Sequence, residues 1–499
     1  AYVAAAVEVY AVFCGVVSGS VSNVLGRILR LRGTKGQYRN AAVMRRNAFV
    51  FQTAFGLLGT IVLLAGADAI AARFFGMQYS SAILMIFAPA VLLRSLSSLF
   101  IGFSRGEGAE LPGAVTDILR QLLILGFSIL FSRLLGDYGD KVSNLLANSN
   151  YRSMYGGIGV AIAVTLTEAL VALSLFLIYR VSRKREGRAM QEGMRVTDSF
   201  LDSVRILCGN RAPQAGLQML AVLFLPLGMI FWQKAGAGSD GAALDYGVYI
   251  ACYGMLCSIC VSLLMLSLLP MCATTVNLLR REESRFARNA FQGGVHIGMV
   301  HGAFAAVFAA VMGDQLGAVF GGEHSAVAAK MLKGGSFIVP LAALALYFAR
   351  LLMVTGKKYF VMGAAAVANV IYLVEESVLL SGGKAGILSL VYAGLAAGGI
   401  FCVILGLFAY RAFRQKMDWL YVMVMPIAAA CVAGLVSVLL GKALTPHLGN
   451  LVASVVCLIL SASLYWVELL LLRNFREQEL EMIPGGRLIT ALGQMLRVL

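Results

Sequence analysis

Charged side chains inside apolar stretches are the residues of this 499-residue chain that could do chemistry. Arg94 lies in an otherwise apolar stretch and is followed at i+3 and i+4 by Ser97 and Ser98, so the three share a face if the stretch is helical. An arginine at membrane depth costs roughly 2.5 to 3.5 kcal/mol on insertion scales, which favours a position facing an interior cavity. Its planar guanidinium suits bidentate binding of phosphate. Arg94 and Ser98 are therefore predicted to bind substrate, with snorkelling or a structural ion pair of Arg94 as the alternative.

A second group of polar side chains lies in the two apolar stretches that follow. Asp117, Arg120 and Gln121 again stand at i, i+3 and i+4. Asp117 and Arg120 can neutralise each other as a structural pair, or Arg120 and Gln121 can bind substrate. Glu168 lies mid-stretch with no basic residue in its own predicted helix. It is expected to pair with Arg94, to carry a coupling proton, or to occupy a satisfied structural site.

Two further sets of polar residues are candidates of a weaker kind. Glu8 lies near the start of the first apolar stretch and is expected either to reach the membrane interface or to take part in charge pairing. The second set repeats at helical spacing and consists of Arg211, Gln214 and Gln218. These residues are candidates for lining a cavity and binding substrate.

The elements that must position these side chains are membrane-spanning helices. The chain is 60% hydrophobic and 13% charged, and its mean hydropathy is +0.83. Apolar runs long enough to cross a bilayer recur along almost the whole length. The sequence therefore predicts an all-α polytopic membrane protein with thirteen spans, near 3–26, 43–66, 80–103, 113–135, 154–179, 205–232, 243–268, 290–311, 330–353, 360–380, 386–410, 419–441 and 450–472.

The net charge of +16 could suggest a nucleic-acid partner, but the basic residues concentrate in alternate connections between spans. By the positive-inside rule these connections are cytoplasmic, as is the C-terminus, while residue 1 lies outside. No nucleic-acid partner is predicted. The connections are 27–46, 105, 180–211, 280–288, 350–358, 411–416 and 473–497.

Enzymatic, metal and cofactor sites find no support in the sequence. No zinc-protease, nucleophile-elbow or P-loop motif occurs, and the longest outward connection, 136–153, contains no histidine. His296 and His301 are five residues apart, which does not give the i, i+4 zinc pair. The nine cysteines lie almost entirely in apolar runs and are interpreted as packing residues. We predict no catalytic residues, no cofactor and no metal.

An internal repeat predicts how the spans are grouped. The tetrapeptide Arg46–Phe49 recurs about 242 residues later as Arg288–Phe291, each time closing a basic connection and opening a span. Six spans separate the copies, so the repeat is parallel, and the first helix of a fourteen-helix fold is expected to be absent. The predicted parts are an N-lobe over 1–179, a cytoplasmic linker over 180–204 that is expected to be an amphipathic helix, a C-lobe over 205–410, a helix pair over 411–472 and a cytoplasmic tail over 473–499.

Several stretches together resemble a known family. A Pro, Ser-Ser, Gly-rich, Pro and Gln pattern runs through Pro89, Ser98, Gly102, Gly106, Pro112 and Gln121. Glu168 is followed by a run similar to the family's sixth helix, and the tail from Glu479 through Pro484 to Arg487 resembles the pattern E-L-x-x-I-P-x-x-G-R-L-I, with one residue fewer after Pro484. On these residues the chain resembles the polysaccharide transporters of the MOP flippase superfamily, in their stage V sporulation protein B-like branch. Arg94 and Arg105 depart from the pattern.

The resemblance implies a fourteen-helix, two-lobed flippase that moves a polyprenyl-pyrophosphate-linked saccharide, a peptidoglycan precursor or an exopolysaccharide unit, across the bacterial cytoplasmic membrane by alternating access. The implied partners are that lipid-linked saccharide, membrane lipids and a coupling cation or proton. Two alternatives stay open: a cation-coupled multidrug antiporter of the same superfamily, and a non-transporting scaffold for cell-envelope synthesis. A multidrug antiporter is expected to have acidic and aromatic residues in its cavity, whereas Arg94, the clearest charge at membrane depth in this sequence, is basic.

Overall fold

The computed structural model describes residues 2–109, 111–148, 150–186, 198–235, 240–382, 386–413 and 417–475, together with Glu479, Gly486 and Thr490. Within these residues the secondary structure is helical, with no strand. Among the described residues, eleven helices are long and apolar enough to cross a membrane, or twelve if the pair α12 (Ser325–Gly335) and α13 (Ile338–Val354), which is bent by 51°, counts as one span. The chain is a multi-pass membrane protein, as its composition predicts.

The last long helix shows why span counts differ between sequence and structure. α16 (Met425–Leu471) contains a kink at Gly449, where φ is 72° and ψ is 166°. The expected spans 419–441 and 450–472 lie on either side of this kink. Glycine adopts positive φ without steric cost, so the chain can bend here where another residue would be strained.

The chain divides into two compact units, 1–238 and 239–499. Span 205–232, which we expected to open the C-lobe, is helix α7 (Phe200–Ala235) and packs against helices of the first unit. Of the expected linker helix, 180–186 continue α6 and 200–204 begin α7, while 187–197 lie outside the described residues. The lobe boundaries drawn from the repeat stay predictions.

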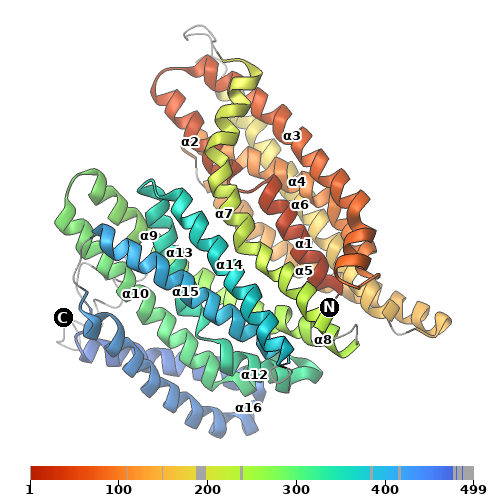
Figure 1. Ribbon diagram of the computed structural model, residues 1–499, viewed down its shortest axis with the longest axis vertical. Coiled ribbons are helices and arrows are strands. Elements are labelled where there is room, and N and C mark those ends of the chain that lie inside the picture. Colours follow the sequence, from red (N-terminus) through yellow and green to blue (C-terminus); the bar gives the residue numbers. More distant parts are fainter. Residues whose placement is uncertain are drawn as a thin grey trace. The chain divides into compact units, whose positions relative to one another are not determined.

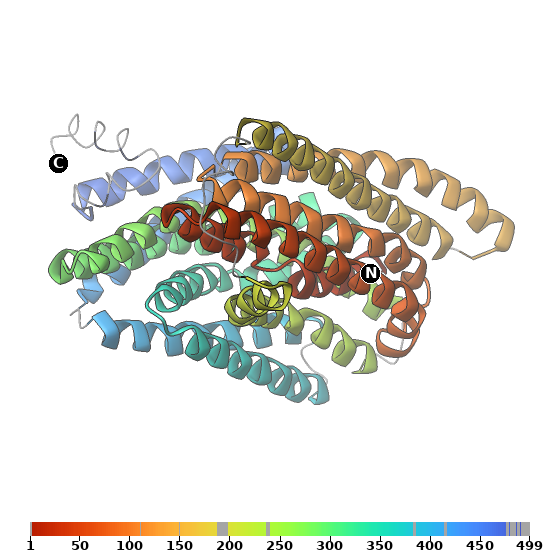
Figure 2. The ribbon, with the colours of Figure 1, turned by 90° about the horizontal axis from the view of Figure 1, so that it is seen from above.

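The first unit is organised around α4 (Ser80–Gly106), as Figure 1 shows. α4 packs against α1 (Tyr2–Val17), α2 (Val21–Thr34), α3 (Tyr38–Ala69) and α6 (Asn150–Glu186). α5 (Leu111–Leu146) packs mainly against α6, and the two lie antiparallel and side by side (Figure 2). The outer face of α5 is apolar and exposed, which suits contact with lipid.

Small residues on one face of α4 let α2 approach closely. Ser98, Gly102 and Gly106 are spaced four residues apart and so share that face. A Cβ added at Gly102 would lie 3.2 Å from the Cα of Ser22, and one added at Gly106 would lie 2.6 Å from the Cβ of Leu29. The glycines of the family-like pattern are therefore the contact points between α4 and α2.

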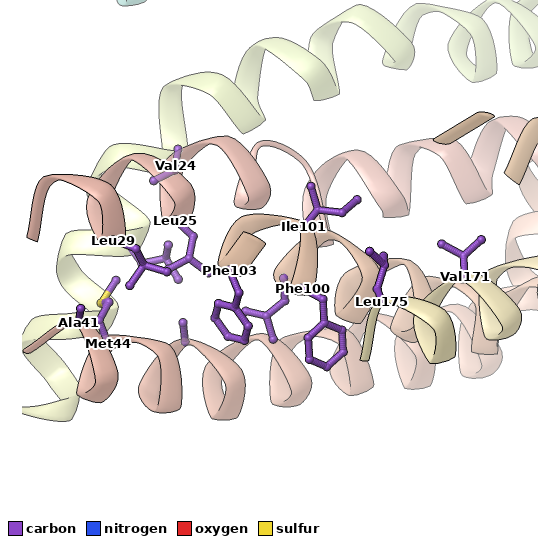
Figure 3. Packing of buried hydrophobic residues seen from close by; sticks show 13 residues of the cluster. Val24, Leu25, Leu29, Ala41, Met44, Phe100, Ile101, Phe103, Val171 and Leu175 are labelled. Carbon is purple, nitrogen blue, oxygen red and sulfur yellow. The ribbon is translucent and has the colours of Figure 1, made fainter. Parts of the chain in front are cut away.

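A hydrophobic cluster fixes α2 below this contact. Leu25 and Leu29 of α2 are fully or almost fully buried and lie next to Phe103 of α4 (Figure 3). Met44 of α3 and Leu175 of α6 complete the same cluster. Each such side chain contributes about 1.5 to 3 kcal/mol on burial, so the position of α2 is strongly determined.

The first expected span, 3–26, is not continuous in the structure. α1 ends at Val17 and α2 begins at Val21, and Ser20 between them has a left-handed backbone with φ 58°. The expected basic connection 27–46 is mostly helical, because α2 continues to Thr34 and α3 begins at Tyr38. A run of apolar residues predicts the length of a span, but a short Ser-Gly-Ser segment inside it can end one helix and begin another.

The second unit contains α8 (Asp240–Val248), α9 (Met255–Arg280), α10 (Ser284–Val311), α11 (Gly313–Phe320), α12, α13, α14 (Lys358–Ser381), α15 (Leu388–Phe413) and α16. Short π-helices precede α9 and α16: η2 (Tyr249–Gly254) and η4 (Leu420–Val424). A further π-helix, η1 (Ile70–Phe74), ends α3 in the first unit. Within the second unit, α10 packs against α9, α13 and α16.

Candidate functional site

A cavity of about 400 Å³ lies inside the first unit, beside the break between α1 and α2. Helices α1, α2, α4, α5 and α7 all contribute to its wall. Its size lies within the range of ligand-binding pockets. The polar and charged side chains that line it are Cys14, Ser18, Ser20, Ser22, Asn23, Arg94, Ser98, Arg105, Asp117, Arg120 and Gln218.

Side chains from three other helices hold the break between α1 and α2. The last carbonyls of a helix have no partner within the helix, so other donors must satisfy them. Arg211 of α7 donates from Nε to the carbonyl of Gly19 at 2.9 Å and from a terminal nitrogen to that of Val17 at 2.6 Å. The other donors to this segment are Arg211 to Val16, Gln52 of α3 to Val17 at 2.6 Å, and Ser98 of α4 to Ser18 at 3.0 Å.

A chain of ion pairs crosses the wall of the cavity. Glu168 of α6 places Oε1 3.1 Å from a terminal nitrogen of Arg94 and 3.0 Å from Nε of Arg120. Arg120 also pairs with Asp117 of its own helix. Glu168 and Arg120 are almost completely buried, whereas 35% of the Arg94 side chain is exposed. Arg94 is therefore the arginine of this chain that a ligand can reach, while the carboxylate of Asp117, with 55% of its side chain exposed, is also accessible.

A third arginine approaches the cavity from the end of α4. Arg105 donates a hydrogen bond to Oγ of Ser22 at 3.1 Å and another to the side-chain carbonyl of Asn23, both in the first turn of α2. The three arginines face two carboxylates, Asp117 and Glu168, so this group carries an excess positive charge. Such a cavity attracts an anion.

The structure brings together most, though not all, of the residues singled out in the sequence. Arg94, Ser98, Asp117, Arg120 and Gln218 line the cavity, and Glu168 contacts two of them. Pairing with Arg94 was one of three expectations for Glu168. The expected substrate-binding residues that do not line the cavity are Gln121, which is exposed on α5, Gln214, which is half-buried on α7, and Arg211, whose hydrogen bonds go to backbone carbonyls.

Glu8 is buried within α1, where the residue is 3% exposed, and it is not part of the cavity wall. Its expected position at the membrane interface stays a prediction. The polar lining residues that sequence reasoning missed are Cys14, Ser18, Ser20, Ser22, Asn23 and Arg105. Arg105 was noted only as a departure from the family pattern. The serines and Asn23 could have been found from the run Ser18-Gly-Ser-Val-Ser-Asn23, which places small polar residues inside an apolar stretch.

The second unit has a closed polar network of its own. The Nδ1 atom of His296 lies 3.0 Å from Oε2 of Glu479, and Tyr421 donates to the same oxygen at 2.7 Å. The Nε2 atom of His296 lies 3.1 Å from Nδ2 of Asn474, and the histidine ring stacks on Tyr421 with a centroid distance of 4.2 Å. No group of three metal-ligating side chains occurs in the part of the chain that the structure describes.

A lone carboxyl also lies in the second unit. Glu376 of α14 is fully buried, and neither of its carboxylate oxygens has a hydrogen-bond partner. Its neighbour Glu375 is partly exposed.

No protein-family model matches the sequence, and no curated protein matches it. Solved structures do match. An inward-facing multidrug-resistance MATE family transporter of the MOP superfamily aligns with a TM-score of 0.63 over 83% of this chain and 91% of its own, at 12% identity. The lipid II flippase MurJ in an inward closed conformation aligns with a TM-score of 0.51 over 92% and 95%, also at 12% identity.

A third structure, a MOP superfamily transporter from Pyrococcus furiosus described as having a binding pocket of reverse polarity, aligns with a TM-score of 0.54 over 82% and 86% at 13% identity. The fold is that of the MOP superfamily transporters. The cavity with three arginines lies within the first unit of this MOP fold. The resemblance to the stage V sporulation protein B-like branch stays a prediction.

Proposed function

We propose that the protein is a MOP-type transporter that moves a polyprenyl-pyrophosphate-linked saccharide, a peptidoglycan precursor or an exopolysaccharide unit, across the bacterial cytoplasmic membrane. The single observation that carries the proposal is the excess of arginine over carboxylate around the cavity of the first unit. A cationic site at membrane depth requires an anionic partner. A pyrophosphate linkage supplies one, with oxygens that match the guanidinium fork.

Arg94 is the proposed primary contact. One of its terminal nitrogens is engaged with Glu168, and its other N–H groups have no hydrogen-bond partner among the described residues. Glu168 holds the guanidinium at the cavity wall and leaves donors open toward the cavity. Arg120 is paired with both Asp117 and Glu168. Its main role is to position the carboxylate of Glu168.

The topology of the proposal follows from the charge distribution. With basic connections on the cytoplasmic side, the C-terminus lies inside. The prenyl chain stays in lipid while the pyrophosphate and saccharide cross through the protein by alternating access. The buried Glu168, one of whose oxygens has no hydrogen bond, is the proposed group for coupling to a proton or cation.

Reconstitution into liposomes tests this function. Purified protein should translocate a fluorescent polyprenyl-pyrophosphate-linked oligosaccharide, measured as the fraction of lipid that becomes accessible to an impermeant quencher. Arg94→Gln should slow translocation about tenfold or more, because a charge-assisted contact to the pyrophosphate is lost. Arg133→Gln, at an exposed position of α5, is the matched control and should leave the rate unchanged. Equal rates for both variants would refute the role of Arg94.

A second function, a cation-coupled multidrug antiporter, is supported by the higher TM-score of the MATE structure, 0.63 against 0.51 for the lipid II flippase. It predicts efflux of a cationic dye such as ethidium from cells that express the protein. The positive cavity disfavours a cationic substrate. Ethidium efflux without movement of the lipid-linked oligosaccharide would decide for the antiporter.

A further inference from the structure

The N-terminus of α2 faces the cavity without a cap. Ser20 occupies the N-cap position, where a serine side chain usually accepts a hydrogen bond from the first turn, yet it makes no such bond. Its hydroxyl is buried, with the residue 6% exposed, and has no hydrogen-bond partner. Ser20 lines the cavity. A residue type suited to capping is therefore present but unused.

The amide groups of this first turn are correspondingly open. The N–H of Val21 bonds to the carbonyl of Ser18 and that of Val24 to the carbonyl of Ser20. Between them, the N–H groups of Ser22 and Asn23 have no acceptor among the hydrogen bonds of the described residues. Both residues line the cavity. Uncapped first-turn amides on a 14-residue helix, carrying the positive end of its dipole, form an anion-binding arrangement.

A cation lies at this positive helix end, where an anion would be favoured. Arg105 is held there by Ser22 and Asn23, and α2 is held against α4 by the close contact at Gly102. Two positive features are thus fixed together by packing. A bound oxyanion would neutralise both, accepting hydrogen bonds from the amides on one side and from the guanidinium on the other.

We propose that the N-terminus of α2, with Ser20, Ser22, Asn23 and Arg105, forms a subsite for a phosphoryl oxyanion. The subsite deepens the proposed function and rests on it for the identity of the ligand, the pyrophosphate of a lipid-linked saccharide. The break between α1 and α2 lies within the helical stretch Tyr2–Thr34, which is long and apolar enough to cross a membrane, so the subsite is placed for a group that crosses the membrane. Arg211 contributes as a positioning residue, because it holds the break in place.

Substitution of Ser20 tests the subsite directly. Aspartate tolerates the left-handed backbone and caps helices well, so Ser20→Asp should occupy the open amides with its own carboxylate and keep or raise thermal stability. Ser20→Asn has the same shape without the charge. In nanodiscs of phosphatidylcholine, Ser20→Asp should bind inorganic pyrophosphate about tenfold or more weakly than Ser20→Asn, measured by calorimetry.

Equal affinities for Ser20→Asp, Ser20→Asn and the unchanged protein would overturn the proposal. Arg105→Gln provides a second measurement that does not depend on residue 20. It should lower pyrophosphate affinity by about tenfold, whereas Arg133→Gln should not change it. Unchanged affinity in Arg105→Gln would count against the subsite in the same way.

Changing the lipid composition of the nanodiscs tests which kind of molecule supplies the bound phosphoryl group. If added phosphatidylglycerol in the nanodiscs competes with pyrophosphate in the unchanged protein but not in Ser20→Asp, the subsite binds headgroup phosphodiesters. If it does not compete, the pyrophosphate assignment stands. Binding that depends on residue 20 without transport of the lipid-linked oligosaccharide would keep the subsite and refute the transport function. Transport of the lipid-linked oligosaccharide, together with pyrophosphate binding that does not depend on residue 20, would keep the transport function and refute the subsite.

Discussion

The buried carboxylates of the two units have different surroundings. In the first unit Glu168 is shared by two arginines at a cavity, and donors of Arg94 stay open. In the second unit Glu479 is enclosed by His296 and Tyr421. The charged groups of the first unit are arranged so that a ligand can bind them, whereas Glu479 in the second unit is satisfied by contacts within the fold.

Two proline-containing helices, one from each unit, show the same difference. Pro89 lies in α4 and Pro340 lies in α13. Five residues after Pro89 comes Arg94, whereas five residues after Pro340 comes the buried Ala345. A cation therefore stands in one helix where a packing residue stands in the other.

The sharpest way to break the comparison is to neutralise one buried carboxyl in each unit. Glu168→Gln leaves Arg94 and the buried Arg120 without their shared counter-charge and should lower the free energy of unfolding by about 3 to 5 kcal/mol. Glu376→Gln removes a buried carboxyl that has no hydrogen-bond partner, so its effect should stay within about 0.5 kcal/mol or be stabilising. Thermal unfolding in detergent measures both. Comparable losses would show that the two carboxyls do not differ in kind.

A steric change at the contact between α2 and α4 should have an intermediate effect. Gly102→Val places atoms against Ser22 and Leu25, and overpacking of this kind costs about 1 to 3 kcal/mol. It should also weaken pyrophosphate binding, since it displaces the N-terminus of α2. Gly126→Val is the control, because nothing lies within 4 Å of its added Cβ. Unchanged pyrophosphate binding by Gly102→Val would show that binding at the cavity does not depend on how α2 packs against α4.

A substitution in the closed network of the second unit should cost less than Glu168→Gln. Glu479→Gln weakens its contacts with His296 and Tyr421 and should cost about 1 to 2 kcal/mol in unfolding free energy, without any change in pyrophosphate binding. Tyr421→Phe removes one contact of the same carboxylate, so the double variant should lose less than the sum of the single losses. Additive losses, or an altered affinity for pyrophosphate, would contradict a purely structural role.

Much of the fold follows from the sequence, because a bilayer allows few solutions. Apolar runs of span length predict helices, and α4, α5 and α6 lie where the runs near 80–103, 113–135 and 154–179 place them. Charges inside such runs are costly, so Arg94 and Glu168 could be singled out without a structure. Spacing along a helix also placed Asp117 and Arg120 on one face, where they form an ion pair.

What the sequence alone determined is the class of the protein, its helices and the deep charges that need partners. Only the tertiary structure decided which partners they have. Arg211 looks like a ligand-binding arginine in sequence, yet carbonyls of Gly19 and Val17, nearly two hundred residues away along the chain, take its hydrogen bonds. The break that supplies those carbonyls is set by contacts with α3, α4 and α7, which have no local signature stronger than a few small polar residues. Hydrogen-bond satisfaction is a property of the packed structure, and so the site is too.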